Sequence, residues 1–320
     1  MMNISKRLDS PSAKPLKGER AFIRRLADEL PADLGPVGFG NDLATLEPRP
    51  GGLLWSTDML MDGVDFESDK HAWRDIGRKA MAVNLSDCAA AATIPIAALC
   101  AVALSDTLSM EDALELSRGV LQCGAAFDCP VTGGDTNSWA QPTVISVAIA
   151  ARPDGENPPV TRDGGHAGDR IYLTGPVGGS LLGRHLDPQP RIATALEINR
   201  RLHPHAMIDI SDGLAIDLWH ICEASGYGAV IDRTLLDAVI HHDARVMAAR
   251  TGKPSHEHAL YDGEDFELIV ALSSDVPPED CRRLGLLPLG EITEQRELML
   301  RDAGGRPSPL EIRGWEHFRA

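Results

Sequence analysis

Positive charge is scarce in this 320-residue chain. Lys and Arg together number 31 and Asp and Glu number 47, which gives a net charge of −16 at pH 7. Proteins that bind nucleic acid or anionic membranes usually present a basic face, so this balance argues against both kinds of partner. Aromatic residues are sparse at 4%, but hydrophobic residues make up 43% of the chain, which is ample for two domains or one large one.

An apolar leader and a membrane span are also missing. The first twenty residues are polar and basic and lack the apolar centre of a signal peptide. Residues 88–104 carry no charge, but this stretch is short for a bilayer and is broken by Pro95. We therefore expect no membrane partner, and predict a helix end, a turn and a buried strand in this stretch.

The six cysteines show neither a CxxC pair nor the spacing to histidine that a metal site needs. Most of them lie within apolar or helical patterns, as buried free thiols do. Because free thiols persist in a reducing compartment, we expect a cytoplasmic protein.

The common phosphate-binding and catalytic motifs are absent as well. The sequence contains no G-x-x-x-x-G-K-[ST], no kinase-type His-Arg-Asp, no H-E-x-x-H and no G-x-S-x-G. A glycine turn, Gly175-Pro176-Val177-Gly178-Gly179, comes after an expected strand. Its backbone N–H groups are candidates for a phosphate cradle, with a plain glycine turn as an equally good interpretation.

The chain does have a series of carboxylates that come directly after apolar runs of strand length. Such runs place the next residues at the edge of a core, and no Lys or Arg stands beside these acids. Buried like charges repel, so protonation or divalent cations are the usual remedies. Oxygen-only ligands favour Mg²⁺, which predicts a Mg²⁺-dependent enzyme that handles phosphates. The runs are Leu53-Leu54-Trp55-Ser56-Thr57-Asp58, Ala82-Val83-Asn84-Leu85-Ser86-Asp87, Pro130-Val131-Thr132-Gly133-Gly134-Asp135 and Ala206-Met207-Ile208-Asp209-Ile210-Ser211-Asp212.

Helix capping is the alternative for each aspartate taken alone. Asp87 precedes an alanine-rich stretch and Asp212 precedes a helical pattern, and Asp is a favoured N-cap residue. Four such runs together, with Asp42 as a fifth carboxylate in Gly38-Phe39-Gly40-Asn41-Asp42, favour a shared metal site.

The order of the apolar patterns predicts two α+β halves. Helices are expected near residues 18–30, 71–86, 109–126, 192–202 and 213–225, and strands near 52–58, 96–105, 130–135, 143–151, 169–175 and 265–272. Residues 152–159 contain three prolines and form the best boundary. We therefore divide the chain into a flexible tail (1–17), an N-terminal domain (18–153) and a C-terminal α+β domain (154–320).

Seven short motifs succeed one another along the chain. They are Gly18-Glu19-Arg20-Ala21-Phe22-Ile23, Gly38-Phe39-Gly40-Asn41-Asp42, Ser56-Thr57-Asp58-Met59-Leu60, Ala82-Val83-Asn84-Leu85-Ser86-Asp87, Gly133-Gly134-Asp135-Thr136, Ile208-Asp209-Ile210-Ser211-Asp212-Gly213 and Gly263-Glu264-Asp265-Phe266-Glu267-Leu268. In this order they resemble the motif series of the thiamine-monophosphate kinase family, part of the ATP-binding superfamily that includes aminoimidazole ribonucleotide synthetase. The match runs from about residue 18 to the end, including Gly314-Trp315-Glu316-His317-Phe318.

The resemblance implies two α/β-sandwich domains of the aminoimidazole ribonucleotide synthetase-like type and a homodimer built through the N-terminal domains. It also implies ATP as co-substrate, several Mg²⁺ ions and thiamine monophosphate as acceptor, with direct in-line transfer of the γ-phosphoryl group. The implied metal ligands are Asp42, Ser56, Thr57, Asp58, Asp87, Asp135, Asp209 and Asp212. The implied nucleotide contacts are Gly134, Asp135, Arg162 and Ser211, and the implied acceptor contacts are Asp65, Glu264 and Trp315.

The chemistry needs charge neutralisation and alignment more than a base, because an acceptor phosphate oxygen is already ionised near neutral pH. We therefore assign no general base. One position departs from the family in an important way, since Asp65 stands where a histidine is expected and would repel a phosphorylated acceptor unless it meets a cation. Two alternatives remain: a related enzyme with another phosphorylated or carbonyl acceptor, and a non-catalytic nucleotide-binding protein.

Overall fold

The computed structural model describes residues 44–46 and 52–316, and every structural statement below concerns these residues. The expected tail at 1–17, the expected helix at 18–30 and the expected metal ligand Asp42 lie outside them.

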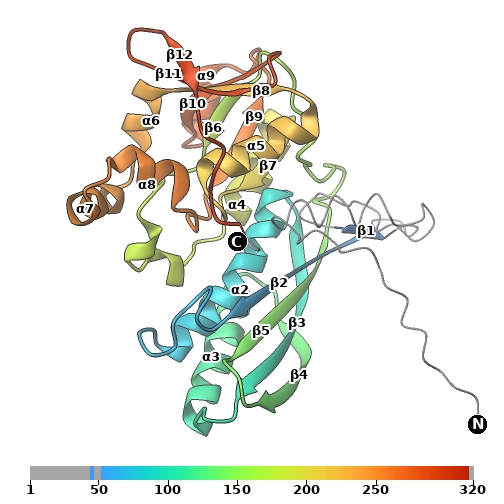
Figure 1. Cartoon of the computed structure of the whole chain (residues 1–320). Coiled ribbons are helices and arrows are strands. Elements are labelled where there is room, and N and C mark those ends of the chain that lie inside the picture. The colour runs from blue at the N-terminus through green and yellow to red at the C-terminus, as the bar shows by residue number, and fades with distance from the viewer. Residues whose placement is uncertain (1–43, 47–51, 317–320) are drawn as a thin grey trace, which may run out of the picture. The chain divides into compact units, whose positions relative to one another are not determined.

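The first half of the described chain builds a five-stranded sheet with helices on one face (Figure 1). The strand order is β1-β2-β5-β3-β4, and β3 and β4 are its only parallel neighbours. Along β2, Ser56 is buried whereas Thr57 and Met59 are exposed, so even-numbered residues face the helices and odd-numbered residues point away. The elements are β1 (Ala44–Leu46), β2 (Leu53–Met61), α2 (Trp73–Ala90), β3 (Ile94–Ser105), α3 (Met110–Ala126), β4 (Val131–Trp139) and β5 (Val144–Arg152).

The second half builds a seven-stranded sheet in the order β12-β11-β8-β10-β6-β9-β7. All five residues of β9 are buried, which is typical of a strand covered on both faces. The elements are β6 (Arg170–Leu173), the 3₁₀ helices η1 (Ser180–Leu182) and η2 (Arg184–Leu186), α4 (Ile192–Leu202), β7 (Ala206–Asp209), α5 (Leu214–Ser225), β8 (Gly228–Asp232), α6 (Arg233–Val239), α7 (His242–Thr251), α8 (Ser255–Tyr261), β9 (Leu268–Leu272), α9 (Pro278–Arg283), β10 (Leu287–Thr293), β11 (Leu298–Arg301) and β12 (Pro307–Pro309).

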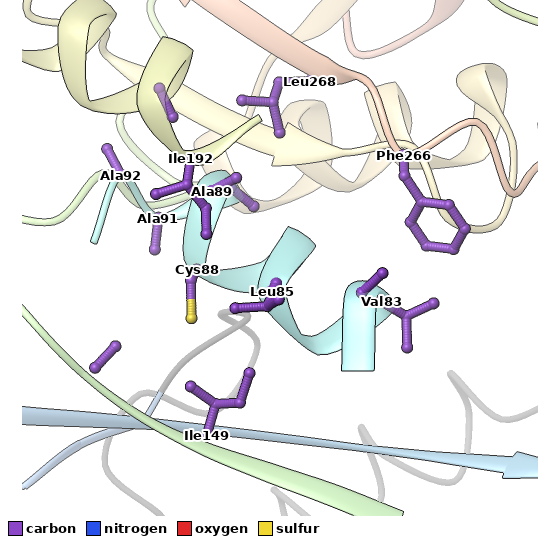
Figure 2. Close-up of a cluster of buried hydrophobic side chains, with 14 of the residues drawn as sticks. Val83, Leu85, Cys88, Ala89, Ala91, Ala92, Ile149, Ile192, Phe266 and Leu268 are labelled. Carbon is purple, nitrogen blue, oxygen red and sulfur yellow. The ribbon is translucent and has the colours of Figure 1, made fainter. Parts of the chain in front are cut away.

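Helix α2 is buried on nearly all sides because both halves pack against it. Figure 2 shows Cys88 of α2 facing Ile149 of β5, whereas Phe266 and Leu268 of the second half lie on the other side of the helix. All of these side chains belong to one hydrophobic cluster. Residues on α2 are therefore well placed to connect polar groups of the two halves.

Two glycines allow α2 and α3 to approach closely. A Cβ atom at Gly77 would lie 2.0 Å from the carbonyl oxygen of Leu116, and one at Gly119 would lie 2.0 Å from the carbonyl oxygen of Arg74. Real Cβ atoms do not come so close to a backbone oxygen, so the helix crossing requires glycine at both positions.

We expect Gly119→Ala to lower the free energy of unfolding by about 1–3 kcal/mol, because the added methyl group must push α3 away from α2. Alanine's better helix propensity, worth about 0.5–1 kcal/mol, offsets part of this loss. Urea unfolding followed by circular dichroism measures the effect. Ser117→Ala, at an exposed position of the same helix, is the control and should stay within about 0.5 kcal/mol of the wild type. An unchanged or more stable Gly119→Ala protein would contradict the close crossing.

The α+β architecture agrees with the sequence prediction, but two aspartates sit in unexpected places. Asp87 lies inside α2, which continues to Ala90, so it neither follows a strand nor caps a helix. Asp135 lies within β4 rather than at its end. Residues 88–104 do form a helix end, a turn and a strand, but Ile96 and Leu99 of that strand are exposed, so the expected burial is wrong.

The remaining general expectations have mixed outcomes. All six cysteines are free, and five are buried. Among the described helices, none is long and apolar enough to cross a membrane. The connection between β5 and β6 spans residues 153–169, and the expected domain boundary at 153/154 falls at its start and stays a prediction.

Candidate active site

Two neighbouring residues of α2 reach polar groups in different halves of the chain. The Ser56 hydroxyl on β2 donates a hydrogen bond to the Asp87 carboxylate. The Ser86 hydroxyl donates to Oδ2 of Asp209, at the end of β7, at 2.5 Å. Helix α2 thus connects three of the expected metal ligands, which are Ser56, Asp87 and Asp209.

The alternation of β2 separates its own three expected metal ligands. Ser56 and Asp58 face the helices, and the Asp58 backbone N–H donates to Oδ1 of Asn84 on α2 at 3.0 Å. Thr57 points to the opposite face, where its hydroxyl donates to the Val147 carbonyl at 3.0 Å. Ser56, Asp58 and Asp87 can therefore share one site, and Thr57 lies on the other side of the sheet.

The turn after β7 is held by backbone hydrogen bonds from two distant segments. The N–H of Glu264 donates to the Ser211 carbonyl, and the N–H of Trp315 donates to the Asp212 carbonyl, both at 2.8 Å. Gly314 is required for this approach, since a Cβ atom there would lie 2.4 Å from the Asp212 carbonyl oxygen. The fold thus brings together Ser211, Asp212, Glu264 and Trp315, which are four of the expected site residues.

Asp217 marks this turn as rich in negative charge. Its carboxylate accepts the N–H groups of Asp212 and Gly213 at 3.0 Å, and the N-cap of α5 is Gly213 rather than Asp212. Burial raises the pKa of Asp217 well above its usual value, and the charges of Asp212 and Asp209 raise it further. Ligand atoms of Asp212, Asp217 and His220 also lie within 4.8 Å of one another. Carboxylates gathered in this way suit a bound cation.

Lys79 is a site residue that the sequence analysis missed. Its side chain is 1% exposed, and its ammonium group donates to Oε1 of Glu264 and to the Asp65 carbonyl, both at 2.5 Å. Burial raises the pKa of Glu264, and the Lys79 charge opposes that rise. Nearby, burial lowers the pKa of His185 to about 4, again with a contribution from Lys79. The buried ammonium group of Lys79 therefore joins Asp65 and Glu264, two of the three residues expected to contact the phosphoryl acceptor.

Asp65 also has a structural task in its own loop. Its carboxylate accepts the Met61 N–H at 2.7 Å, and its N–H donates to the Met61 carbonyl at 3.0 Å. The Asp65 carboxylate therefore closes the turn after β2. This turn presents the Asp65 carbonyl to Lys79.

We expect Asp65→Ala to raise the KM for the acceptor about 5- to 10-fold, because the turn loses a hydrogen bond worth about 1 kcal/mol. Asp65→Asn retains an oxygen that accepts the Met61 N–H and should stay within about threefold of the wild type. Steady-state kinetics with ATP held saturating make the comparison. If asparagine behaves like alanine, the charge of Asp65 matters and the turn does not.

Three of the residues expected to bind the nucleotide or the metals lie apart from the residues around Asp87 and the Asp212 turn. They are Thr57, Gly134 and Asp135. The strand registers align Met59, Ser146, Ala101 and Asp135 in one row, on the face turned away from the helices. Asp135 thus lies three strand spacings, or about 14 Å, from β2. Thr57 lies on the same face of the sheet, and Gly134 directly precedes Asp135 on β4.

Arg162, the remaining expected nucleotide contact, acts electrostatically on Asp217, because its charge lowers the pKa of that carboxyl. Its carbonyl accepts the Ser225 hydroxyl at the end of α5, at 3.1 Å. Gly134 and Asp135 lie on the outer strand of the first sheet.

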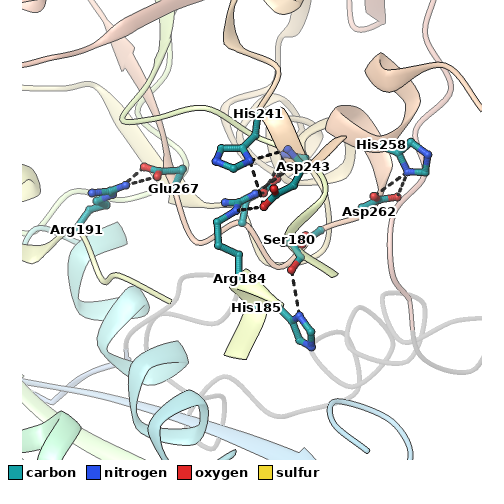
Figure 3. Close-up of polar contacts among 12 residues, drawn as sticks. Ser180, Arg184, His185, Arg191, His241, Asp243, His258, Asp262 and Glu267 are labelled. Carbon is teal, nitrogen blue, oxygen red and sulfur yellow. Dashed lines mark hydrogen bonds and ion pairs between the residues drawn. The ribbon is translucent and has the colours of Figure 1, made fainter. Parts of the chain in front are cut away.

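The glycine turn after β6 is not available as a phosphate cradle. The Gly178 N–H donates to both carboxylate oxygens of Asp265, at 2.9 and 2.7 Å. Arg184 donates to the same carboxylate and pairs with Asp243, and Figure 3 shows this group beside the His258–Asp262 pair. Protein carboxylates occupy the position that the phosphate interpretation gave to a ligand, so the plain glycine turn is correct.

Comparisons with known proteins find thiamine-monophosphate kinases both among the curated relatives and among the similar solved structures. Residues 40–152 match the family model "AIR synthase related protein, N-terminal domain". Thiamine-monophosphate kinase of Rhodopirellula baltica is 37% identical over 80% of this chain and 81% of its own length, and that of Synechococcus elongatus is 32% identical over 94% and 96%. The structure of "AaThiL complexed with AMPPCP and TMP" is similar with a TM-score of 0.82 and 26% identity, covering 99% of this chain and 100% of that one.

Proposed function

The chain belongs to the thiamine-monophosphate kinase family, and on this premise we propose that it transfers the γ-phosphoryl group of ATP to thiamine monophosphate, giving thiamine diphosphate. The observation that carries the proposal is the likeness, over nearly the whole chain, to a relative whose complex holds AMPPCP and TMP. AMPPCP is an ATP analogue with a carbon bridge between its last two phosphorus atoms. Those two ligands correspond to the two substrates of the proposed reaction.

Mg²⁺ is the cation that suits the gathered donors, because they are carboxylate and hydroxyl oxygens. The raised pKa of Asp217 beside Asp209 and Asp212 supports a cation at this turn. We propose that Ser56, Asp58, Asp87, Asp209 and Asp212 hold Mg²⁺, with Thr57, Asp135 and Asp42 as the further ligands that the family resemblance implies. When bound, Mg²⁺ neutralises charge on the phosphates of both substrates.

The chain's own residues mainly bind and orient the substrates. The acceptor oxygen is ionised near neutral pH, so no side chain has to remove a proton from it. Lys79 and Glu264 form the polar end of the proposed acceptor site together with the Asp65 turn. Trp315 is 51% exposed beside the Asp212 turn, and the proposed role of its ring is to stack on a ring of the acceptor.

The nucleotide is proposed to contact Gly134, Asp135, Arg162 and Ser211. Ser211 lies in the turn after β7, and the positive charge of Arg162 acts on Asp217 beside that turn, which supports a place for ATP phosphates there. Gly134 packs tightly on β3, since a Cβ atom there would lie 1.8 Å from the Cys100 carbonyl oxygen. Gly134 and Asp135 lie on the outer strand β4, and their contact with the nucleotide is a proposal from the family resemblance.

A homodimer is proposed because the sheet face turned away from the helices is apolar and exposed. Met59 is 60% exposed, Leu99 46% and Ile96 38%, although all three are large hydrophobic residues. Such a surface is usually covered by a partner, and a second copy of this chain presents the same surface for a symmetric contact. The face also carries Thr57 and Asp135, so a dimer contact there would border two proposed metal ligands.

We expect Leu99→Glu to convert the dimer into a monomer at micromolar concentration, because two copies would bury unpaired carboxylates against each other. Light scattering coupled to size-exclusion chromatography reports the mass. Leu121→Glu is the matched control, since Leu121 is 51% exposed on α3, outside this face. A monomeric wild type, or a dimeric Leu99→Glu protein, would contradict the interface.

The proposed reaction is tested by ADP release from purified protein with ATP, Mg²⁺ and a panel of acceptors. Thiamine monophosphate should support turnover, and unphosphorylated thiamine should not. Turnover with a different phosphorylated or carbonyl acceptor alone would favour the related-enzyme alternative, and ATP binding without any turnover would favour a non-catalytic protein.

We further propose a cytoplasmic location, in keeping with six free cysteines.

A further inference from the structure

A second group of possible metal ligands lies outside the proposed active site. Ligand atoms of His166, Asp169 and His205 all lie within 4.8 Å of one another. Nδ1 of His205 is 2.9 Å from Oδ2 of Asp169, and the rings of His166 and His205 meet edge to face with their centroids 4.9 Å apart. Two imidazoles and one carboxylate therefore converge on a single point.

The backbone holds these three residues in place before any ion binds. Asp169 is 3% exposed, and its Oδ2 accepts the His166 N–H at 2.8 Å. The N–H of His205 donates to the Ala271 carbonyl on β9 at 2.9 Å, which fixes the segment before β7. The Asp169 carbonyl accepts the Ile292 N–H from β10 at 2.8 Å. Both segments are thus anchored to the second sheet.

The exposure of the three side chains leaves one side of the cluster open, through which an ion can reach it from solvent. Asp169 is buried, His205 is half-buried with 35% of its side chain exposed, and His166 is exposed. An ion can enter from the His166 side and displace the contacts of His205 Nδ1 with the two carboxylate oxygens of Asp169, at 3.0 and 2.9 Å. Small side-chain rotations then suffice, since ligands of a tetrahedral zinc ion lie about 3.3 Å apart.

We propose that His166, Asp169 and His205 form a Zn²⁺ site with water completing the coordination. Two imidazole nitrogens and one carboxylate suit zinc, whereas Mg²⁺ prefers oxygen ligands alone. The donor chemistry therefore distinguishes this site from the proposed Mg²⁺ site at Asp209 and Asp212. It would tie the turn before β6 to the segment between α4 and β7.

Calorimetric titration of the full-length, chelator-treated protein with ZnCl₂ in the presence of excess Mg²⁺ tests the proposal. We expect one Zn²⁺ per chain that Mg²⁺ does not displace. His166→Ala and His205→Ala should each weaken this binding at least about tenfold. His203→Asn is the control, because His203 lies two residues from His205 outside the cluster, and asparagine tolerates its positive φ of 50°.

Thermal unfolding provides a second readout. Zn²⁺ should raise the Tm of the wild type and of His203→Asn but not that of His166→Ala. His166 is exposed, so its replacement decides the question even if His205→Ala fails to fold. Unchanged Zn²⁺ affinity in His166→Ala, or no binding to the wild type, would overturn the proposal and leave an ordinary His205–Asp169 ion pair.

Discussion

Asp87→Asn and Asp212→Asn are each expected to reduce turnover about 100- to 1,000-fold while the protein stays folded. Asparagine keeps the shape and one oxygen of each side chain but removes a negative charge. Asp87 is bonded to Ser56, and Asp212 belongs to the turn whose charge raises the pKa of Asp217. If these carboxylates hold Mg²⁺ against the phosphates, each loss removes transition-state stabilisation of several kcal/mol.

Turnover at saturating ATP and Mg²⁺, with circular dichroism as a check on folding, measures the effect. Asp275→Asn is the control, because Asp275 is exposed and lies far along the chain from the proposed ligands. The two active-site variants should also require more Mg²⁺ for half-maximal activity than the control. Near wild-type turnover in both would return Asp87 and Asp212 to purely structural roles.

Lys79→Met is expected to reduce kcat/KM for thiamine monophosphate at least about 100-fold and to change the KM for ATP less than threefold. An ammonium group has three N–H donors, and among the described residues two of them meet Glu264 and the Asp65 carbonyl. In the proposed acceptor site the third would donate to a phosphate oxygen of the acceptor. The lysine would then supply the cation that a phosphorylated acceptor needs beside Asp65 and Glu264.

Loss of Lys79 also has a structural cost, which a second variant separates from the effect on the acceptor. Removing one partner of a buried ion pair costs about 3–5 kcal/mol, and less here because the Glu264 side chain is 24% exposed. Adding Glu264→Gln to Lys79→Met removes the unpaired charge and should restore most of the stability. Because Glu264 is itself a proposed acceptor contact, the comparison is with Glu264→Gln alone, and activity toward thiamine monophosphate in the double variant should stay well below that of the single variant.

Lys70→Met is the matched control, since Lys70 pairs with Glu67 on the surface and is 62% exposed. Full activity in the stable double variant would show that Lys79 only supports the fold. A rise in the KM for ATP that equals the loss for the acceptor would instead assign Lys79 to the nucleotide.

The sequence predicted the Asp209–Asp212 turn well because its local signals are strong. A short buried strand ends at Asp209, and a helix begins two residues after Asp212. The segment around Asp87 was harder, because α2 is buried on nearly all sides and its apolar residues show no clear helical face. The predicted helix ended at residue 86, whereas α2 continues to Ala90, because the apolar residues after Asp87 give no local signal of a helix end. Asp87 was therefore expected at the end of an element instead of inside one.

Lys79 shows which information a single sequence does not contain. Its partner Glu264 is 185 positions away, so no local spacing links the two. Lys79 is one of five charged residues in α2 and directly follows Arg78, so the composition of the helix does not single it out. The helices α6, α7 and α8 were also missed, because they are only 7, 10 and 7 residues long and follow one another closely, which leaves little room for a clear helical period.

The proposed phosphoryl transfer is tested most directly by ³¹P NMR of the purified protein with ATP, Mg²⁺ and thiamine monophosphate. The spectrum should lose the monophosphate signal and gain the two coupled signals of thiamine diphosphate, with one ADP formed for each diphosphate. A sample with Lys70→Met should give the same spectrum, and one with Asp87→Asn should keep its substrates over the same time. ADP accumulation together with inorganic phosphate, with the thiamine monophosphate signal unchanged, would contradict the proposed acceptor.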